Sequence, residues 1–287
     1  MTAILLDGEA LAREMRTQLA KTVADLALEG VTPGLGTILV GDDAASVRYV
    51  AKKHDDCAEI GIASVHEHLA SDVSQDELMA VIARFNADAA VDAFLLQVPL
   101  PPGLDEEAAL LAVEPTKDVD GLHPLNLGRL AMGTPGPLPC TPSGIVELLA
   151  AYDVPVEGRH VVIIGRGLTI GRPLAMLLSL KRKACNAAVT VVHTGVSDLA
   201  WYVRSADVVV AAAGRAGLVT PDMVKPGAAV VGAGTTWQGH KLFSDVVDDV
   251  AEVAGWITPR LGGVGPMTRA MLLRNTVRAA ERRAARS

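Results

Sequence analysis

Val-Val-Ile-Ile-Gly-Arg-Gly-Leu-Thr-Ile-Gly-Arg-Pro, residues 161–173, is the stretch that decides the fold class. Its first four side chains are β-branched and apolar, which is typical of a buried strand, and Pro173 suits the first turn of a helix. Gly165, Gly167 and Gly171 lie between the two. This order predicts an α/β unit whose helix N-terminus can bind a pyrophosphate through free N–H groups. Because the spacing Gly-x-Gly-x-x-x-Gly is one residue longer than the common dinucleotide fingerprint, a structural turn is the alternative.

The strands that follow extend this unit and bear on the cofactor. Apolar runs at 189–192, 208–210 and 228–231 alternate with helical stretches, so we expect a mainly parallel sheet. The first of these runs ends in His193-Thr194-Gly195, without the carboxylate that binds the ribose 2′-hydroxyl of NAD. Arg166 supplies a cation that can pair with a 2′-phosphate, although a surface arginine is the alternative. The pattern favours NADP over NAD.

The N-terminal half predicts a second α/β domain. We expect an amphipathic helix over 9–29, a strand over 37–40, and a helix that Ser46 caps and that runs from there to about Ile60. Gly30 and Gly61 would end the two helices. A buried strand follows over 93–97. Residues 133–142 contain four prolines and predict a stiff linker at a domain boundary.

Composition narrows the class of protein. The 287-residue chain is half apolar, has a net charge of −7, and contains three widely separated cysteines, Cys57, Cys140 and Cys185. The acidic balance argues against a nucleic-acid partner, and the cysteine spacing indicates neither a disulfide framework nor a zinc site. No apolar run has the length of a membrane span or a signal peptide. We therefore expect a cytoplasmic protein with no metal site and no membrane partner.

Tyr49 and Lys53 are four residues apart and share one face of the predicted helix. Desolvation in a dry pocket lowers the proton affinity of a lysine, which can then act as a base near neutral pH. The tyrosine, one turn away, can orient it by a hydrogen bond. Because any helix contains such pairs, a structural role is the alternative.

Residues 262–268, Gly-Gly-Val-Gly-Pro-Met-Thr, form a second glycine-rich segment. Glycine costs about 0.5–1 kcal/mol of backbone entropy in regular structure, and we expect no packing requirement for three glycines in four positions. The segment predicts either backbone that closes over a ligand or a tight turn before a helix, since Pro266 and Thr268 suit a helix start.

Six motifs occur in order along nearly the whole chain. They are Ser46-x-x-Tyr49-Val50-x-x-Lys53, Gln97-Val-Pro-Leu-Pro101, Lys117-Asp-Val-Asp-Gly121 with His123-Pro124, Cys140-Thr-Pro-x-Gly144, the glycine turn at 165–171, and residues 262–268. Together they resemble the bifunctional methylenetetrahydrofolate dehydrogenase/methenyltetrahydrofolate cyclohydrolase family, the FolD type.

The resemblance implies an α/β fold of two domains. Residues 1–138 plus 268–287 would form the folate-binding catalytic domain, and 139–267 a Rossmann-like NADP-binding domain with a mainly parallel sheet. The implied activity is oxidation of 5,10-methylenetetrahydrofolate to 5,10-methenyltetrahydrofolate with NADP, followed by hydrolysis to 10-formyltetrahydrofolate. This chemistry belongs to one-carbon metabolism and purine biosynthesis. The family also implies a cytoplasmic homodimer that associates through the second domain.

The resemblance also assigns roles to residues. Lys53, Tyr49, Gln97 and Asp120 would be catalytic, with Asp120 as the anchor of the pterin and Gln97 as the amide partner of Lys53. Tyr49, Gln97 and Asp120, together with Gly262, Gly263 and Pro266, would bind the folate. The implied cofactor-binding residues are Gly165, Arg166, Gly167, Gly171, His193, Thr194 and Thr235.

The chain departs from the family pattern at four positions. Leu261 replaces a proline, Gly232 an aspartate, and Gly167 and Thr194 each replace a serine. Three other functions stay open: an enzyme of this fold with one activity only, a non-catalytic folate- or nucleotide-binding relative, and an unrelated NADP-dependent reductase such as a shikimate dehydrogenase relative. Retention of Lys53 argues against a pure binding protein, which has no need of the amine.

Overall fold

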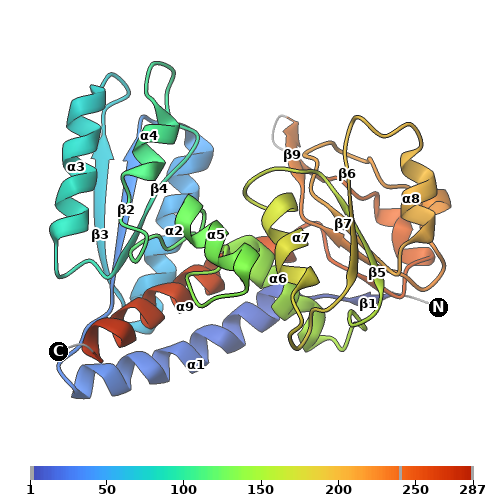
Figure 1. Cartoon of the computed structure of the whole chain (residues 1–287), viewed down its shortest axis with the longest axis horizontal. Coiled ribbons are helices and arrows are strands. Elements are labelled where there is room, and N and C mark those ends of the chain that lie inside the picture. Colours follow the sequence, from blue (N-terminus) through green and yellow to red (C-terminus); the bar gives the residue numbers. More distant parts are fainter. Residues whose placement is uncertain (1–2, 239–240, 286–287) are drawn as a thin grey trace. The chain divides into compact units, whose positions relative to one another are not determined.

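The computed structural model describes residues 3–238 and 241–285, and the chain divides into two compact units (Figure 1). Unit 1 consists of Met1–Arg13, Leu130–Gly133 and Pro139–Thr268, and unit 2 of Glu14–Arg129, Thr134–Leu138 and Arg269–Ser287. Three of the five boundaries fall within helices, namely α1 (Gly8–Leu28), α5 (Pro124–Met132) and α9 (Val264–Ala284). The first thirteen residues therefore belong to unit 1, although the sequence analysis assigned them to the folate domain.

Unit 1 is built on a six-stranded sheet in which every pairing is parallel, in the order β1-β11-β8-β7-β5-β6. The strands are β1 (Ile4–Leu5), β5 (His160–Ile164), β6 (Ala188–Val192), β7 (Val208–Ala211), β8 (Ala229–Gly232) and β11 (Trp256–Ile257). The connections include α6 (Cys140–Ala151), α7 (Gly171–Ser179), α8 (Leu199–Ser205) and two 3₁₀ turns, Pro221–Met223 and Asp248–Glu252. An antiparallel hairpin of β9 (Thr235–Gln238) and β10 (Lys241–Ser244) follows β8.

Burial explains the composition of this sheet. The central strands β5, β7 and β8 consist almost entirely of buried Val, Ile and Ala, and Val161 pairs with both Val189 and Val208. Parallel strands that are covered on both faces are expected to be such continuous apolar runs. The predicted α/β fold with a mainly parallel sheet is confirmed.

Unit 2 contains a smaller parallel sheet in the order β3-β2-β4. Its strands are β2 (Gly34–Val40), β3 (Ala63–Leu69) and β4 (Ala93–Leu96), and its helices include α2 (Ala44–Ile60), α3 (Gln75–Ala87) and α4 (Glu106–Leu111). Helix α2 packs on β2 and β3. On the α3 side, Ile82 and Phe85 belong to a buried cluster that also contains Ile38 and Phe94 of the sheet.

Two local predictions were wrong. Asp43, not Ser46, caps α2: its carboxylate accepts a 2.8 Å hydrogen bond from the Ser46 backbone N–H, and the helix begins at Ala44. The predicted linker ends early, because α6 begins at Cys140 and includes Pro142. Proline is tolerated in a first helical turn, where its missing N–H would have no helical acceptor.

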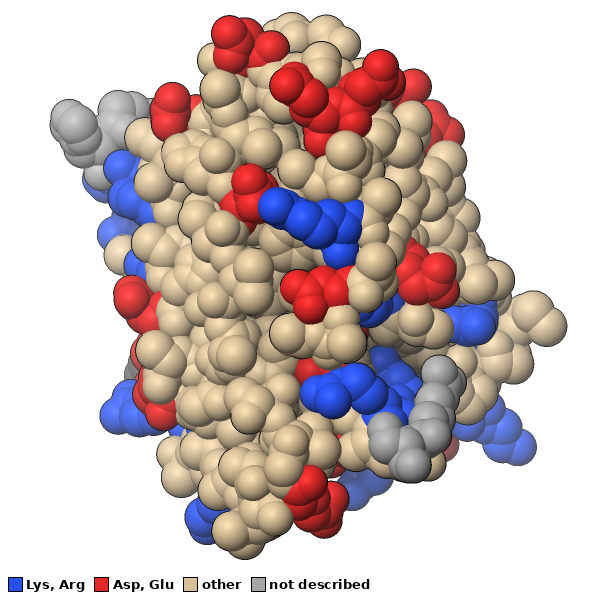
Figure 2. Space-filling view, turned by 90° about the vertical axis from the view of Figure 1, so that its left-hand side faces the viewer, with Lys and Arg blue, Asp and Glu red and all other residues tan. Residues whose placement is uncertain are grey.

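Surface charge is mixed on the face drawn in Figure 2. Acidic and basic side chains are interspersed there among uncharged ones, and acidic groups gather toward the upper end. Among the described helices, none is both long and apolar enough to cross a membrane.

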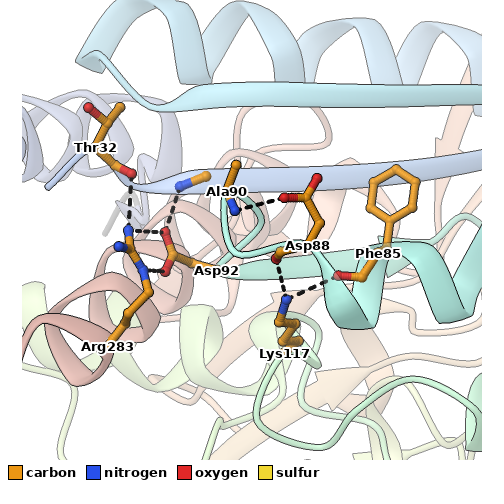
Figure 3. Close-up of polar contacts among 8 residues, drawn as sticks. Thr32, Phe85, Asp88, Ala90, Asp92, Lys117 and Arg283 are labelled. Atoms are coloured by element: carbon orange, nitrogen blue, oxygen red, sulfur yellow. Dashed lines mark hydrogen bonds and ion pairs between the residues drawn. The ribbon is translucent and has the colours of Figure 1, made fainter. Parts of the chain in front are cut away.

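The C-terminal helix is fastened within unit 2 by an ion pair (Figure 3). Arg283 of α9 donates from Nε to Asp92 Oδ1 at 2.6 Å and from Nη2 to Asp92 Oδ2 at 3.2 Å. Asp92 directly precedes β4, and its carboxylate also accepts from the Gly34 N–H at the start of β2, 2.9 Å away. One buried carboxylate therefore joins α9 to two strands of the smaller sheet.

Candidate active site

Lys53 of unit 2 is buried and contacts both Gln97 and Tyr49. Only 4% of the residue is exposed, and its Nζ donates a 3.2 Å hydrogen bond to Oε1 of Gln97, directly after β4. The ammonium also lies 4.6 Å from the centroid of the Tyr49 ring, one turn back along α2. Tyr49 therefore meets Lys53 through its aromatic face, a cation–π contact. The structure brings together three of the residues that the sequence analysis selected.

Asp120 belongs to a loop that the neighbouring Asp118 holds in shape. Asp118 is buried, and its carboxylate accepts hydrogen bonds from the backbone N–H groups of Gly121 and His123 at 3.0 and 2.8 Å and from Nδ2 of Asn126 at 2.9 Å. A carboxylate that accepts several hydrogen bonds fixes the loop backbone around it. Asp120 itself is partly buried.

Two further contacts secure the same loop. Lys117 donates from Nζ to the carbonyl oxygens of Phe85 and Asp88 at 3.0 and 2.6 Å, at the end of α3 (Figure 3), and burial lowers its pKa. Asn275 of α9 donates from Nδ2 to the Val119 carbonyl at 2.9 Å. The sequence analysis did not select Asn275, because one asparagine among the other polar residues of a helix carries no specific signal.

The glycine turn of unit 1 has a steric basis. A Cβ on Gly165, whose φ is +120°, would lie 2.2 Å from the Ala212 carbonyl oxygen, and a Cβ on Gly171 would lie 2.1 Å from the Gly165 carbonyl oxygen. Both positions therefore require glycine, since atoms cannot approach so closely. Nothing lies within 4 Å of the Cβ position at Gly167. That glycine has no steric basis, and the serine usual in the family would fit.

Arg166 and His193 meet at this turn. Nη1 of Arg166 lies 3.3 Å from Nε2 of His193, and the Gly195 N–H donates to His193 Nδ1 at 3.0 Å. A neutral imidazole has one accepting nitrogen. When Nδ1 accepts from Gly195, Nε2 carries the proton, and Arg166 faces a donor. An anionic oxygen placed here would accept from both groups.

Thr194 and Thr235 are the other predicted cofactor residues outside the glycine turn. Thr194 follows His193 after β6, and Thr235 is exposed at the start of β9. Gly232, where the family pattern has an aspartate, lies close to β10: a Cβ there would be 2.6 Å from Oγ of Ser244. The Ser244 hydroxyl thus occupies space that a side chain at position 232 would need.

The segment 262–268 departs from its predicted form. Helix α9 begins at Val264, so Gly265 and Pro266 are helical rather than loop. Gly262 has a φ of +81°, a Cβ on Gly263 would lie 2.9 Å from the Pro259 carbonyl oxygen, and a Cβ on Gly8 would lie 1.8 Å from the Gly263 carbonyl oxygen. The expectation that packing requires none of these glycines was therefore wrong for Gly262 and Gly263. Gly265 has open space around its Cβ position.

Among the described residues, no group of three or more His, Cys, Asp or Glu side chains is arranged to hold a metal ion. Cys57, Cys140 and Cys185 are buried and not joined in disulfides. Burial, with a smaller contribution from Asp56 and against an opposing one from Lys53, raises the pKa of the Cys57 thiol to about 12.

Comparison with known proteins matches two segments of the chain to one family. Residues 6–120 match the model of the tetrahydrofolate dehydrogenase/cyclohydrolase catalytic domain, and residues 139–284 match the NAD(P)-binding domain of the same family. The chain is 55% identical over 287 residues to the bifunctional protein FolD of Syntrophotalea carbinolica, covering 100% of this chain and 99% of the relative.

Solved structures of the same family are similar to this chain over nearly its whole length. The bifunctional FolD enzyme of Campylobacter jejuni superposes with a TM-score of 0.93 at 43% identity and covers 98% of this chain and 99% of its own. A dehydrogenase-cyclohydrolase of Trypanosoma brucei, solved with NADP and an inhibitor, has a TM-score of 0.93 at 39% identity and full coverage of both chains.

Proposed function

Because the chain belongs to the tetrahydrofolate dehydrogenase/cyclohydrolase family, it is an enzyme of folate one-carbon chemistry, and we propose that Lys53 is the base of its hydrolysis step and that Arg166 selects NADP. The enzyme oxidises 5,10-methylenetetrahydrofolate to 5,10-methenyltetrahydrofolate with NADP and hydrolyses that product to 10-formyltetrahydrofolate. The observation that carries the site assignment is the buried Lys53 in contact with Gln97 and Tyr49.

The first step transfers a hydride from the methylene carbon that bridges the two folate nitrogens to C4 of the nicotinamide. The nitrogen lone pairs stabilise the cation that is left, so the protein's contribution is placement of the two reactants. Asp120 would accept hydrogen bonds from the pterin N–H and amine, an arrangement that suits a single carboxylate. Gln97 would hold Lys53 beside the reacting carbon.

The second step adds water to the methenyl carbon, after which the bond from that carbon to one folate nitrogen breaks. The attacking water loses one proton when it adds and its second when the formyl C=O forms. The departing nitrogen gains one proton and the other is released to solvent, because the methenyl reactant is a cation and that charge is lost in the product. A neutral Lys53 amine can accept the first proton and return it to the nitrogen, which is general base and then general acid catalysis. Burial of Lys53 supports this role, since desolvation favours a neutral amine.

The cofactor is NADP, with Arg166 and His193 proposed as the partners of its 2′-phosphate. The proximity of these residues fits such a group, because phosphate oxygens can accept from the guanidinium and from an imidazole N–H. Gly165 and Gly171 allow the backbone of the turn to pack closely against Ala212 and against itself. The N-terminus of α7 would then face the pyrophosphate. Gly167, Thr194 and Thr235 complete the proposed set.

The wider assignments are proposals as well. Residues 1–138 plus 268–287 would be the folate domain and 139–267 the NADP domain, with Gly262, Gly263 and Pro266 binding folate. We propose a cytoplasmic homodimer that supplies one-carbon units for purine biosynthesis. Trp237 on the β9–β10 hairpin is 57% exposed and supports association through the second domain, because exposed aromatic residues are enriched at interfaces.

Separate assays of the two half-reactions test the proposal. With 5,10-methylenetetrahydrofolate we expect reduction of NADP in large preference to NAD, and with 5,10-methenyltetrahydrofolate alone we expect hydrolysis above the uncatalysed rate. Absence of either activity in folded protein would indicate an enzyme with one activity. Absence of both, with folate still bound, would indicate a binding protein.

A further inference from the structure

A buried ion pair joins the helix that carries Lys53 to the C-terminal helix. Arg269 of α9 donates from Nε to Oδ2 of Asp56 on α2 at 2.6 Å. The side chains are only 14% and 10% exposed, respectively, so water screens the pair weakly. Both residues belong to unit 2. Removing one partner of such a pair leaves an uncompensated charge beside its neighbours.

The neighbour that matters is Lys53. Asp56 follows it by three residues in α2, and residues at that spacing share one face of a helix. Both residues are buried. The Cys57 thiol senses both charges, because Asp56 raises its pKa and Lys53 lowers it. The Asp56 carboxylate and the Lys53 ammonium therefore act on the same buried region.

Without a cation beside it, the Asp56 carboxylate would hinder Lys53 from acting as a base. It would stabilise the Lys53 ammonium, and water activation requires the neutral amine. An opposite charge close to an ionisable amine favours its charged form, and a close partner typically moves the pKa by about one unit or more. The Arg269 guanidinium, in contact with Asp56, offsets most of this attraction.

We propose that Asp56 and Arg269 are a positioning pair for methenyltetrahydrofolate hydrolysis: Arg269 cancels the Asp56 charge beside Lys53 and so keeps the lysine able to accept a proton from water. The pair touches neither substrate nor cofactor in this account and acts only through Lys53. The inference rests on the proposed role of Lys53 as the base.

Other charged or titratable groups lie around α2 and can affect the pH dependence of hydrolysis. His54 on α2 shares Thr37 of β2 with His66 of β3, Glu59 on α2 pairs with Arg16 of α1 at 2.9 Å, and Gln97 contributes an uncharged amide to Lys53. The Arg16–Glu59 pair is a matched control, because it also joins α2 to another helix but lies six residues beyond Lys53.

The test uses the full-length enzyme and measures the rate of 5,10-methenyltetrahydrofolate hydrolysis against pH, after subtraction of the uncatalysed rate. Arg269→Gln leaves the Asp56 carboxylate uncancelled, so we expect the acidic limb of the profile to move about one unit toward higher pH. Asp56→Asn leaves the Arg269 cation uncancelled, so we expect a shift of similar size toward lower pH. The double variant should return the limb close to the wild-type position.

Opposite shifts from the two halves of one pair cannot come from simple loosening of α2. Glu59→Gln should lower the thermal midpoint without moving the limb, and circular dichroism confirms that each variant is folded. Shifts in the same direction, or no shift in folded variants, would overturn the inference while leaving Lys53 as the base. If Lys53→Met hydrolyses at the wild-type rate, the proposed role of Lys53 as the base and this inference both fail.

Discussion

Nζ of Lys53 donates a 3.2 Å hydrogen bond to Oε1 of Gln97, and Nε2 of Gln97 donates at 2.8 Å to the carbonyl oxygen of Val98. The second bond fixes the amide, because only its nitrogen can donate to a carbonyl, and the oxygen is thereby turned toward the lysine. Helix α2 and the end of β4 thus hold the amine from two directions. An uncharged acceptor orients Lys53 without the attraction that a carboxylate would exert on its proton.

Arg166 should set the preference between cofactors. Arg166→Ala removes the cation proposed to pair with the 2′-phosphate, and a charge-assisted hydrogen bond contributes about 1.5–3 kcal/mol. We expect NADP affinity to fall about tenfold to a hundredfold, while NAD affinity changes little. Fluorescence titration with both cofactors measures the two constants. Equal weakening of both would show that Arg166 only shapes the turn.

Arg283 should stabilise unit 2 through Asp92, whose side chain is 1% exposed. Arg283→Ala leaves this carboxylate with the Gly34 N–H but without its cation. Because the arginine side chain is 40% exposed, water offsets part of the loss, and we expect destabilisation by about 1–3 kcal/mol. Urea unfolding measures it, and Glu281→Ala on the exposed face of α9 is the control, expected within about 0.5 kcal/mol of wild type. Equal midpoints for the two variants would contradict the assignment.

The hydrogen-bonded histidines should make stability depend on pH. Thr37 Oγ1 lies 3.0 Å from His54 Nε2 and 2.8 Å from His66 Nδ1, and this hydroxyl has one proton to donate. Burial lowers the pKa of both rings below 6.5, and each ring also feels a neighbouring histidine. The unfolded chain therefore binds more protons just below pH 6.5, so stability is full above that value and falls as pH decreases.

Unfolding midpoints at pH 7.5 and pH 5.5 measure this dependence. The double variant His54→Gln/His66→Gln should lose less stability across that interval than wild type, whatever its stability at pH 7.5. An unchanged loss in the double variant would place the pH dependence on other groups.

The fold was predictable from sequence where burial dictates composition. Strands β5, β6, β7 and β8 of the larger sheet were predicted because β-branched apolar runs have few alternatives, and Gly61 was recognised as the αL end of α2. The two-residue strands β1 and β11 were missed because they are too short to form such a run. Strand β3 was missed because it is an exposed edge whose segment, Ala63–Leu69, contains no apolar run. The β9–β10 hairpin and the capping role of Asp43 depend on local backbone geometry that residue types alone do not determine.

Part of the candidate site was predictable from sequence and part was not. The glycine turn was enough to select Arg166, whereas Lys53 and Gln97 were selected through the family resemblance that the six ordered motifs carry. Contacts between distant segments were not predictable, since Asp56 and Arg269 are 213 residues apart and each resembles an ordinary surface charge of a helix. The steric need for Gly263 was likewise hidden, because it arises from the close approach of Gly8 and Pro259.

Hydrolysis of 5,10-methenyltetrahydrofolate by Lys53→Met is the most direct test of the account. Methionine keeps the apolar stem of the side chain and removes the amine, so α2 should stay packed and folate should still bind. General-base help contributes about 10²–10⁴-fold, and we predict a loss of that size in hydrolysis, with part of the NADP-dependent oxidation retained. Wild-type hydrolysis by a folded Lys53→Met enzyme would contradict the central claim that the lysine held by Gln97 and Tyr49 is the base.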